Sequence, residues 1–474
     1  MVSYDRSVDD RSLWLRRIPR WLLVLVAVTA AILIGVTLGL VGMGPGRGTA
    51  HPPAAPAAPS VSAQAEARGA GHPAGQEERA DARRNDVGHL LDRRAAAIRA
   101  HDRAAFLATV DPRATPFRDR QAALFDNLAQ VPLASWDYQV VAPDVFTLTP
   151  ARQAELGGDQ TYAAQVDLTY RIADLDGTPM RSPQYQTFVK RDNAWYVAAD
   201  TDGATADLTS GVNLWDLGPV TVLKSSAGVV LGIGNKNDLK AYQHDIETAV
   251  PDVTKVWGSS WASNSVVVVP ADEAQMARLL GAEPQKYARI AAVTTGERGA
   301  AAGAAPADRV IVNPEAFREL GAVERRVVMT HEITHVASRA YTRNWTPTWL
   351  SEGFADYIGY LDSGQPVRNA APELRRDVRD GKIPTGLPTD EQFETTQDEL
   401  PQAYEMGWLA CRMIAERWGQ DKLVAFYRAV GEPAPDGAKV DQDSRLSGAM
   451  VSVLGMGPDE FTKTWVQYVR MQLK

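Results

Sequence analysis

The chain holds one stretch in which residue types and spacing suit a chemical reaction. From Val327 to Tyr357 it reads VVMTHEITHVASRAYTRNWTPTWLSEGFADY, which places His331 and His335 four positions apart and Glu352 after sixteen further residues. Side chains four apart on a helix lie one turn from each other on nearly the same face, so both imidazoles can reach one ion. Zinc accepts imidazole nitrogen and carboxylate oxygen, and a catalytic zinc site leaves its fourth position to water.

Glu332 follows His331 directly and would face that water. As a carboxylate it can accept the water's proton while the oxygen attacks a carbonyl. The alternative interpretation of the motif is a surface helix with two solvated histidines. Only seven of the 474 residues are histidine, so a chance His-Glu-x-x-His is expected in on the order of one such chain in a hundred. The pattern therefore favours a metal site with a general base.

Two helices must hold these side chains. No proline or glycine interrupts the sequence from Glu324 to about Ala340, which predicts one continuous helix that carries both histidines. Thr346-Pro347 then predicts an N-cap and a first-turn proline for a second helix. That helix carries Glu352 and, four residues later, Asp356.

HEITH followed by WLSEGFADY resembles the gluzincin metallopeptidases, the group that includes thermolysin and the aminopeptidase N family. The resemblance implies that His331, His335 and Glu352 bind one Zn²⁺ per chain, and that Glu332 is the general base. It also implies that Asp356 hydrogen-bonds the far nitrogen of a ligand histidine, which fixes the tautomer and orientation of the ring.

The resemblance extends over about residues 313–418 and implies two further roles. Tyr404, in a Tyr-x-x-Gly segment, is similar to the aminopeptidase N tyrosine that steadies the oxyanion by donating a hydrogen bond; an ordinary packed aromatic is the alternative. In gluzincins the strand nearest the zinc is a sheet edge along which substrate lies as an added strand. This places the substrate along four residues ahead of the motif: Ala291, Ala292, Val293 and Thr294.

Composition bounds the class of protein. Apolar residues make up 45% of the chain and charged residues 23%, as in folded proteins, and the length predicts more than one domain. The net charge of −8 is not gathered into a basic stripe, which argues against a nucleic acid partner. Cys411 is the only cysteine, so no internal disulfide can form, and its apolar helical context predicts a buried inert thiol.

The N-terminal region has the pattern of a membrane anchor. Residues 1–20 are polar and rich in arginine, which predicts a cytoplasmic tail, and Trp21–Met43 runs without a charge over a length that predicts a single transmembrane helix. A cleaved signal peptide and a buried core helix are the alternatives. Residues 44–85, rich in Ala, Pro and Gly, predict a disordered spacer. The predicted location is the cell membrane, with the rest of the chain outside the cytoplasm.

Residues 86–207 predict a small α+β domain. Helical periodicity comes first, and three strand signals follow, at Trp136–Val141, Tyr162–Ile172 and Tyr185–Val197. Arg191-Asp192-Asn193 breaks the last of these as a hairpin turn. Helices followed by a curved antiparallel sheet resemble the NTF2-like fold, and we interpret the domain as structural or substrate-presenting.

Residues 213–474 predict the peptidase domain. Its first half offers short strands at Val220–Leu223, Val229–Ile233, Ser265–Val269, Ile290–Thr294 and Arg309–Asn313, with a helix over Leu239–Val250. Helices dominate after the motif. The predicted fold class is therefore α+β: a transmembrane helix, an NTF2-like domain, and a zincin-type domain with a mixed sheet, an active-site helix and a C-terminal helical half.

The sequence thus predicts a membrane-anchored zinc metallopeptidase outside the cytoplasm, acting on a peptide or protein. No Gly-x-Met-Glu-Asn segment precedes HEITH, and in aminopeptidase N relatives that segment anchors a free N-terminus, so endopeptidase activity is favoured over aminopeptidase activity. Two alternatives stay open. One is a catalytically silent zincin-fold binding or assembly protein at the cell surface, and the other is a zinc hydrolase of a non-peptide substrate.

Overall fold

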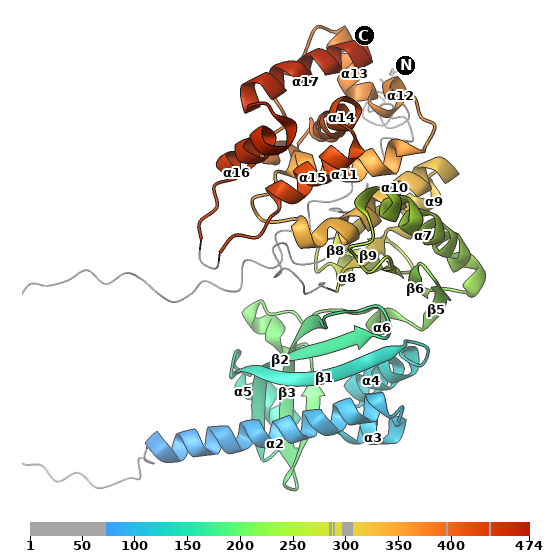
Figure 1. Ribbon diagram of the computed structural model, residues 1–474. Helices are drawn as coiled ribbons and strands as arrows, with labels where there is room; N and C mark the ends of the chain where they lie inside the picture. The colour runs from blue at the N-terminus through green and yellow to red at the C-terminus, as the bar shows by residue number, and fades with distance from the viewer. Residues whose placement is uncertain (1–72, 284–286, 288–289, 296–306, 395–396, 436–437) are drawn as a thin grey trace, which may run out of the picture.

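The structure, a computed structural model, describes residues 73–474 except 284–286, 288–289, 296–306, 395–396 and 436–437. The chain forms two parts, each built on one β-sheet (Figure 1). The N-terminal part occupies one end of the molecule. The C-terminal part places its sheet next to the N-terminal part and a group of helices at the far end.

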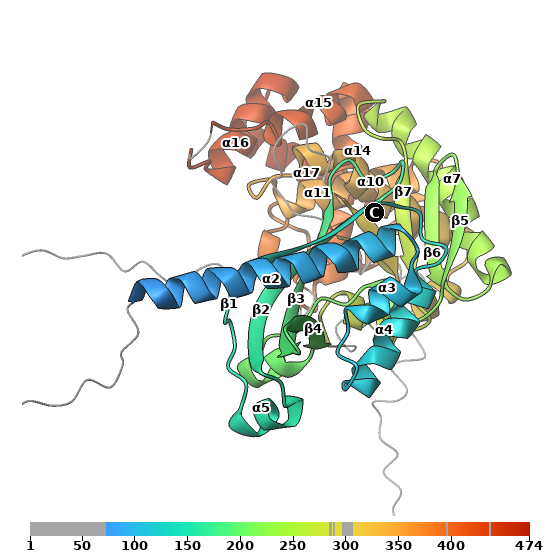
Figure 2. The same ribbon diagram turned by 90° about the horizontal axis from the view of Figure 1, so that it is seen from below.

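The N-terminal part combines three leading helices with a four-stranded antiparallel sheet whose strands follow sequence order. The long first helix lies across the sheet (Figure 2), where Leu90 and Leu91 share a buried cluster with Phe188 and Val197. The elements are α2 (Pro73–Arg99), α3 (Arg103–Ala108), α4 (Thr115–Asn127), β1 (Leu133–Pro143), α5 (Pro150–Leu156), β2 (Gln160–Ile172), β3 (Met180–Arg191), β4 (Ala194–Ala199) and the 3₁₀ turn η3 (Asp202–Ala206).

The strand segments and the hairpin turn predicted in this part are confirmed. β3 and β4 are joined through Asp192 and Asn193, whose φ angles are 48° and 64°. A two-residue hairpin turn of type I′ requires positive φ at both central residues, and Asp and Asn tolerate that conformation better than most side chains. The local sequence is sufficient to set this turn.

α2 starts earlier than the sequence predicted. Because it begins at Pro73, the prediction of a spacer over residues 44–85 is wrong from that residue on. The segment is rich in alanine, arginine and glutamate, which favour helix. Arg83 also fixes it to the sheet, since its guanidinium pairs with Asp144 over 2.8 Å and lies 4.4 Å from the centroid of the Tyr162 ring. Residues 44–72 lie outside the described residues.

The C-terminal part is built on a mixed five-stranded sheet. Its strands are β5 (Val220–Ser225), β6 (Gly228–Ile233), β7 (Ser265–Val269), β8 (Ala292–Thr295) and β9 (Arg309–Val312), in the order β5-β6-β7-β9-β8. β6, β7 and β9 are parallel, whereas β5 and β8 pair antiparallel with their neighbours. β8 is therefore an edge strand among the described strands.

Both faces of this sheet are buried, which explains its runs of valine. Val267 and Val310 point into the cluster that contains α7 (Lys236–Trp257) and α10 (Ala322–Ser338). Val266 and Ile311 point the other way, into a cluster with Trp136 of the N-terminal sheet. The N-terminal part thus serves as the second layer over the five-stranded sheet.

A buried ion pair joins the two parts next to the edge strand. Arg309, the first residue of β9, donates to both carboxylate oxygens of Asp176 over 2.7 and 2.6 Å. The two side chains are 5% and 2% exposed. Asp308, the preceding residue, accepts from Arg339 just past α10. The position of the N-terminal part is therefore fixed relative to α10.

Helices make up most of the remaining chain. Before the motif these are α6 (Leu214–Leu217), α8 (Glu273–Leu279) and α9 (Pro314–Arg318). After α10 come η5 (Arg339–Tyr341), α11 (Thr348–Leu361), α12 (Val367–Ala370), α13 (Pro372–Arg379), η6 (Asp390–Phe393), α14 (Leu400–Trp418), α15 (Gln420–Val430), α16 (Gln442–Ala449), the π-helical turn η7 (Met450–Leu454) and α17 (Pro458–Leu473).

The structure corrects the predicted fold class and location. Across the described residues, none of the helices combines the length and the apolar character that a membrane span requires. The longest of them, α2, α7 and α14, all carry charged residues along their length. The predicted transmembrane helix, and with it the single-pass location in the cell membrane, is therefore wrong for the described fold, a mixed arrangement of sheets and helices. Trp21–Met43 and residues 1–20 lie outside the described residues.

Candidate metal centre

α10 carries the first half of the centre. Its first turn is closed by Glu324, whose Oε2 accepts a hydrogen bond from the Gly321 amide over 2.5 Å. The helix ends at Ser338 and continues as the 3₁₀ turn η5, in agreement with the helix predicted through about Ala340. Every residue from Val327 to His335 is buried, because α7 and α11 pack against it.

α11 carries the second half, but it is capped in a way that the sequence did not reveal. The predicted N-cap at Thr346 is wrong, since its hydroxyl accepts from the Arg343 amide over 2.9 Å. Pro347 occupies the N-cap position instead. The first free amide, that of Thr348, donates to Asp390 Oδ1 of η6 over 2.8 Å. A carboxylate distant in sequence therefore closes this helix end.

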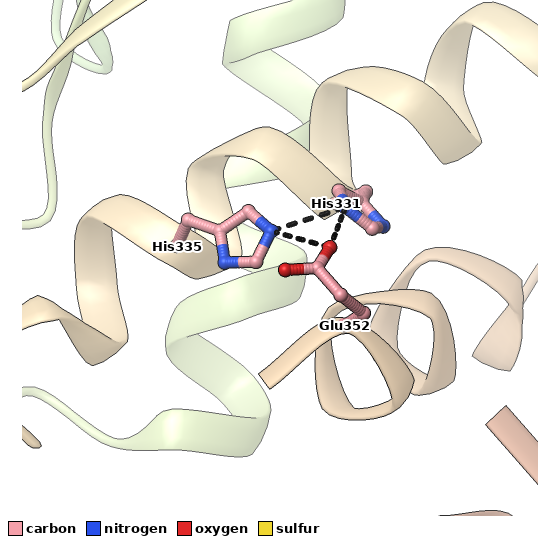
Figure 3. A group of neighbouring side chains, drawn as sticks. All are labelled: His331, His335 and Glu352. Atoms are coloured by element: carbon pink, nitrogen blue, oxygen red, sulfur yellow. Dashed lines mark hydrogen bonds and ion pairs between the residues drawn. The ribbon is translucent and has the colours of Figure 1, made fainter. Parts of the chain in front are cut away.

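The two helices bring three ligand atoms together (Figure 3). His331 Nε2 and His335 Nε2 are 3.1 Å apart, and Glu352 Oε2 lies 3.3 Å from each of them. Tetrahedral zinc with bonds of about 2.0–2.1 Å holds neighbouring ligands about 3.3 Å apart. The three side chains are 4%, 5% and 0% exposed. The triangle of protein atoms therefore already has the dimensions of a zinc site.

Asp356 orients one of the histidines. Its Oδ1 lies 2.7 Å from Nδ1 of His331, and both groups are buried. When Nδ1 carries the proton and donates it to Asp356, the lone pair of Nε2 points toward Glu352. Asp356 lies one helical turn after Glu352, so α11 provides both groups from one face.

The centre has an excess of negative charge. Glu332, Glu352 and Asp356 are 0%, 0% and 3% exposed. In each of them one buried oxygen, Oε1, Oε2 and Oδ2 respectively, has no hydrogen-bond partner among the described residues. Against these three carboxyl groups stand two imidazoles. Isolated buried charges are costly, so the group of side chains calls for a cation. A divalent metal bound by the two histidines and Glu352 fits that requirement.

The pKa values of these groups reflect a competition between burial and the charges of their neighbours. Burial alone would lower the pKa of His331, but Asp356, Glu352 and Glu332 outweigh it and raise that pKa well above its usual value. For His335, burial prevails and lowers the pKa. Burial raises the pKa of Glu332 to about 7, whereas the two histidines outweigh burial for Glu352 and lower its pKa to about 2. The surroundings therefore shift the pKa values of the two glutamates in opposite directions.

Thr294 holds Glu332 from the edge strand. Its hydroxyl lies 2.6 Å from Oε2 of Glu332 and 3.0 Å from the backbone oxygen of the same residue. Thr294 is one of the residues predicted to line the substrate, and β8 does lie beside α10 at the edge of the sheet. Its side chain, however, faces the glutamate. The sequence did not predict this contact, which joins residues far apart along the chain.

The other residues of the predicted substrate strand are buried. Ala292 and Val293 belong to β8 and point into the clusters on the two sides of the sheet. Ala291 precedes the strand, and its oxygen accepts from the Asn313 amide over 2.8 Å. The side chains of this segment are therefore enclosed by the protein itself.

Tyr404 is buried near the centre. Its ring centroid lies 6.5 Å from that of His331 and 5.2 Å from that of Phe393, and the residue is 1% exposed. α14 can bring it there because α11 and α14 cross closely at Gly353 and Gly407, where a methyl group on Gly353 would lie 2.3 Å from the Gly407 backbone. The close crossing of the two helices therefore requires glycine at both positions, which explains the glycines of the Gly-Phe and Tyr-x-x-Gly sequences.

Comparison with known proteins does not assign the chain to a family. No family model matches it, and no curated protein matches it either. The gluzincin and NTF2-like resemblances therefore stay predictions based on sequence patterns.

Proposed function

We propose that the chain is a zinc-dependent metallopeptidase. The proposal is supported above all by the convergence of His331 Nε2, His335 Nε2 and Glu352 Oε2 within 3.3 Å of one another. None of the described residues satisfies that glutamate oxygen with a hydrogen bond. Asp356 behind His331 and Glu332 beside it complete a set that resembles the gluzincin arrangement. The proposed cofactor is one Zn²⁺ per chain.

His331, His335 and Glu352 would hold the zinc, which would supply the Lewis acidity that lowers the pKa of water and polarises a carbonyl. Glu332 accepts the proton of the attacking water and later delivers it to the leaving amine. A buried carboxylate beside the ligand His331 is placed to take a proton from the water and return it. Thr294 keeps Oε2 of that carboxylate in place. Oε1 forms no hydrogen bond with a described residue.

A peptide or protein is the proposed substrate, bound along the free edge of β8. Backbone hydrogen bonds to the edge strand hold the scissile bond without selecting particular side chains. Tyr404 would donate a hydrogen bond to the carbonyl oxygen as negative charge develops on it. Because the chain lacks a Gly-x-Met-Glu-Asn segment ahead of HEITH, we favour endopeptidase activity.

A peptide library tests this function. The purified full-length chain is incubated with matched free and N-acetylated peptides, with and without a zinc chelator. We expect cleavage that the chelator abolishes and that N-acetylation does not slow. Cleavage confined to free N-termini would indicate an aminopeptidase. Intact peptides in every condition would contradict the proposal and leave the catalytically silent binding protein as the better account.

A further inference from the structure

The groove between α10 and α11 opens into a cavity beyond the metal centre. The two helices touch at the level of His331 and Asp356, and again one turn further on, where a methyl group on Gly359 would lie 3.0 Å from Val327 O. One more turn along, the groove widens into a cavity of about 350 Å³, which α12 and α13 close from the side. This volume lies within the range of small-molecule sites.

One wall of the cavity is apolar. Val323 and Val327 contribute from α10, and Ala370 and Pro372 from the α12–α13 segment. Val323, in the first turn of α10, is 41% exposed, which is a high value for a valine. Covering this apolar surface with an apolar group of a ligand would remove it from water, which favours binding.

The lining of the cavity also includes two arginines. These are Arg368 and Arg375, and neither guanidinium forms an ion pair or a hydrogen bond with another described residue. Nε of Arg375 is buried without a partner. The acidic group of the lining, Glu324, already accepts from the Gly321 amide. Two guanidinium groups and one carboxylate leave a charge of +1, which matches a monoanion.

We propose that this cavity binds a small monoanionic carboxylate with an apolar body. The carboxylate meets Arg368 and Arg375, and the body covers Val323 and Val327. Arginine suits the role because its planar group can pair with both oxygens of a carboxylate. A dianion would leave a net negative charge beside Glu324, and a neutral molecule would leave the arginines unpaired.

The site lies within reach of the metal centre. Val327 is one turn before His331 on α10, and Tyr360 of the lining is one turn after Asp356 on α11. A ligand that holds these two turns together acts on the His331–Asp356 contact. We therefore expect the ligand to regulate metal binding. This expectation rests on the proposed function, whereas the binding of the ligand in the cavity does not.

Calorimetric titration of the full-length chain with hexanoate, hexanol and inorganic phosphate tests the binding. We expect hexanoate to bind with a dissociation constant of about 1 mM or tighter, and the other two to bind at least about tenfold more weakly. Arg375→Gln and Arg368→Gln should each weaken hexanoate about tenfold, since each removes a charged partner. Arg379→Gln, at an exposed arginine of α13 outside the cavity, is the matched control and should bind as the unaltered chain does.

Val323→Glu provides a variant that should fold, because a carboxylate in the first turn of a helix is favourable. It places a competing anion beside the arginines and should abolish hexanoate binding. Unchanged affinity in this variant and in Arg375→Gln, or no binding by the unaltered chain at ~10 mM, would overturn the site.

The regulatory half is tested by zinc titration of the metal-free chain with and without saturating hexanoate. Coupled sites change each other's affinity reciprocally, so we expect the zinc dissociation constant to shift about fivefold or more. An unchanged constant would overturn the coupling and leave the binding site standing. Zinc binding without any peptide hydrolysis would instead count against the proposed function alone.

Discussion

A buried ion pair in the N-terminal part and the candidate metal centre in the C-terminal part differ in how their charges are balanced. In the N-terminal part, Arg191 donates to both oxygens of Asp111 over 2.9 and 2.7 Å, and its remaining donors reach the backbone oxygens of Leu156 and Gly157. At the metal centre, three carboxyl groups share two imidazoles and each has a buried oxygen without a hydrogen bond. The first arrangement is complete in itself, whereas the second is complete only with a cation.

The difference separates a self-contained ion pair from a group of side chains that could hold a metal ion. Burial alone does not distinguish them, since Asp111 is 1% exposed and Glu352 is 0% exposed. What distinguishes them is whether the protein supplies the balancing charge.

The largest effect should follow Glu332→Gln. The amide keeps the volume of the side chain but cannot accept a proton, so peptide hydrolysis should fall by at least about 10²–10⁴-fold. Zinc content should not change, because Glu332 is not a ligand. Turnover measured with a peptide that the unaltered chain cleaves checks this. Glu319→Gln, an exposed glutamate ahead of α10, is the control; equal rates in all three proteins would remove Glu332 from the role of base.

Asp111→Ala should lower the stability of the N-terminal part without changing zinc binding. It leaves the buried guanidinium of Arg191 without its partner, which costs about 3–5 kcal/mol of unfolding free energy. Urea unfolding measures the loss, and Asp119→Ala, at an exposed aspartate in the same part, should change it little. Zinc affinity of the folded variant should match that of the unaltered chain. A large loss of zinc would show that the two regions are not separable.

The metal-free centre should become less stable as pH rises. Burial raises the pKa of Glu332 from 4.5 to about 7, so between these values the folded state binds a proton that the unfolded state has lost. Stability attributable to this group therefore falls by up to about 3 kcal/mol from pH 4.5 to 7. Unfolding of the chelated protein and of its Glu332→Gln variant at pH 5 and 8 measures the difference. A variant with the same pH dependence as the parent would refute the assignment.

The smallest effect should follow Thr294→Val. Loss of one hydroxyl removes the hydrogen bond that holds Oε2 of Glu332, and we expect kcat/KM to fall about tenfold while zinc content stays the same. Thr295→Val, next on β8, is the matched control, since the Thr295 hydroxyl donates to the Arg309 backbone oxygen over 3.4 Å and, among the described residues, not to Glu332. Similar rates for the two variants would mean that Thr294 does not position the glutamate.

The parts of the centre that the sequence revealed are those set by local geometry. His331, Glu332 and His335 follow from a four-residue spacing on one helix, and the β3–β4 hairpin follows from Asp192-Asn193. Their placement needs no knowledge of distant residues. Glu352 and Asp356 lie on a separate helix, and only the family resemblance indicated that they would meet the histidines.

The features that the sequence did not reveal depend on tertiary contacts. Thr294 meets Glu332 because β8 is added antiparallel to β9 at the sheet edge, and Asp390 caps α11 from a distant turn. Residues 73–85 favour helix, but a proline-rich stretch precedes them, and the sequence pattern alone does not show where the helix begins. Contact with the sheet stabilises this first part of α2, which starts at Pro73. The Gly353–Gly407 crossing was also missed, although paired glycines in two buried helices are a signal of close packing.

The central claim is that one metal ion binds between α10 and α11 through His331, His335 and Glu352. Elemental analysis of the purified chain and its variants after exposure to zinc tests it most directly. The account predicts one zinc per chain in the unaltered protein and in His244→Ala, whose histidine is exposed on α7, and none in His335→Ala or Glu352→Ala. A folded Glu352→Ala variant that retains a full equivalent of zinc would contradict it.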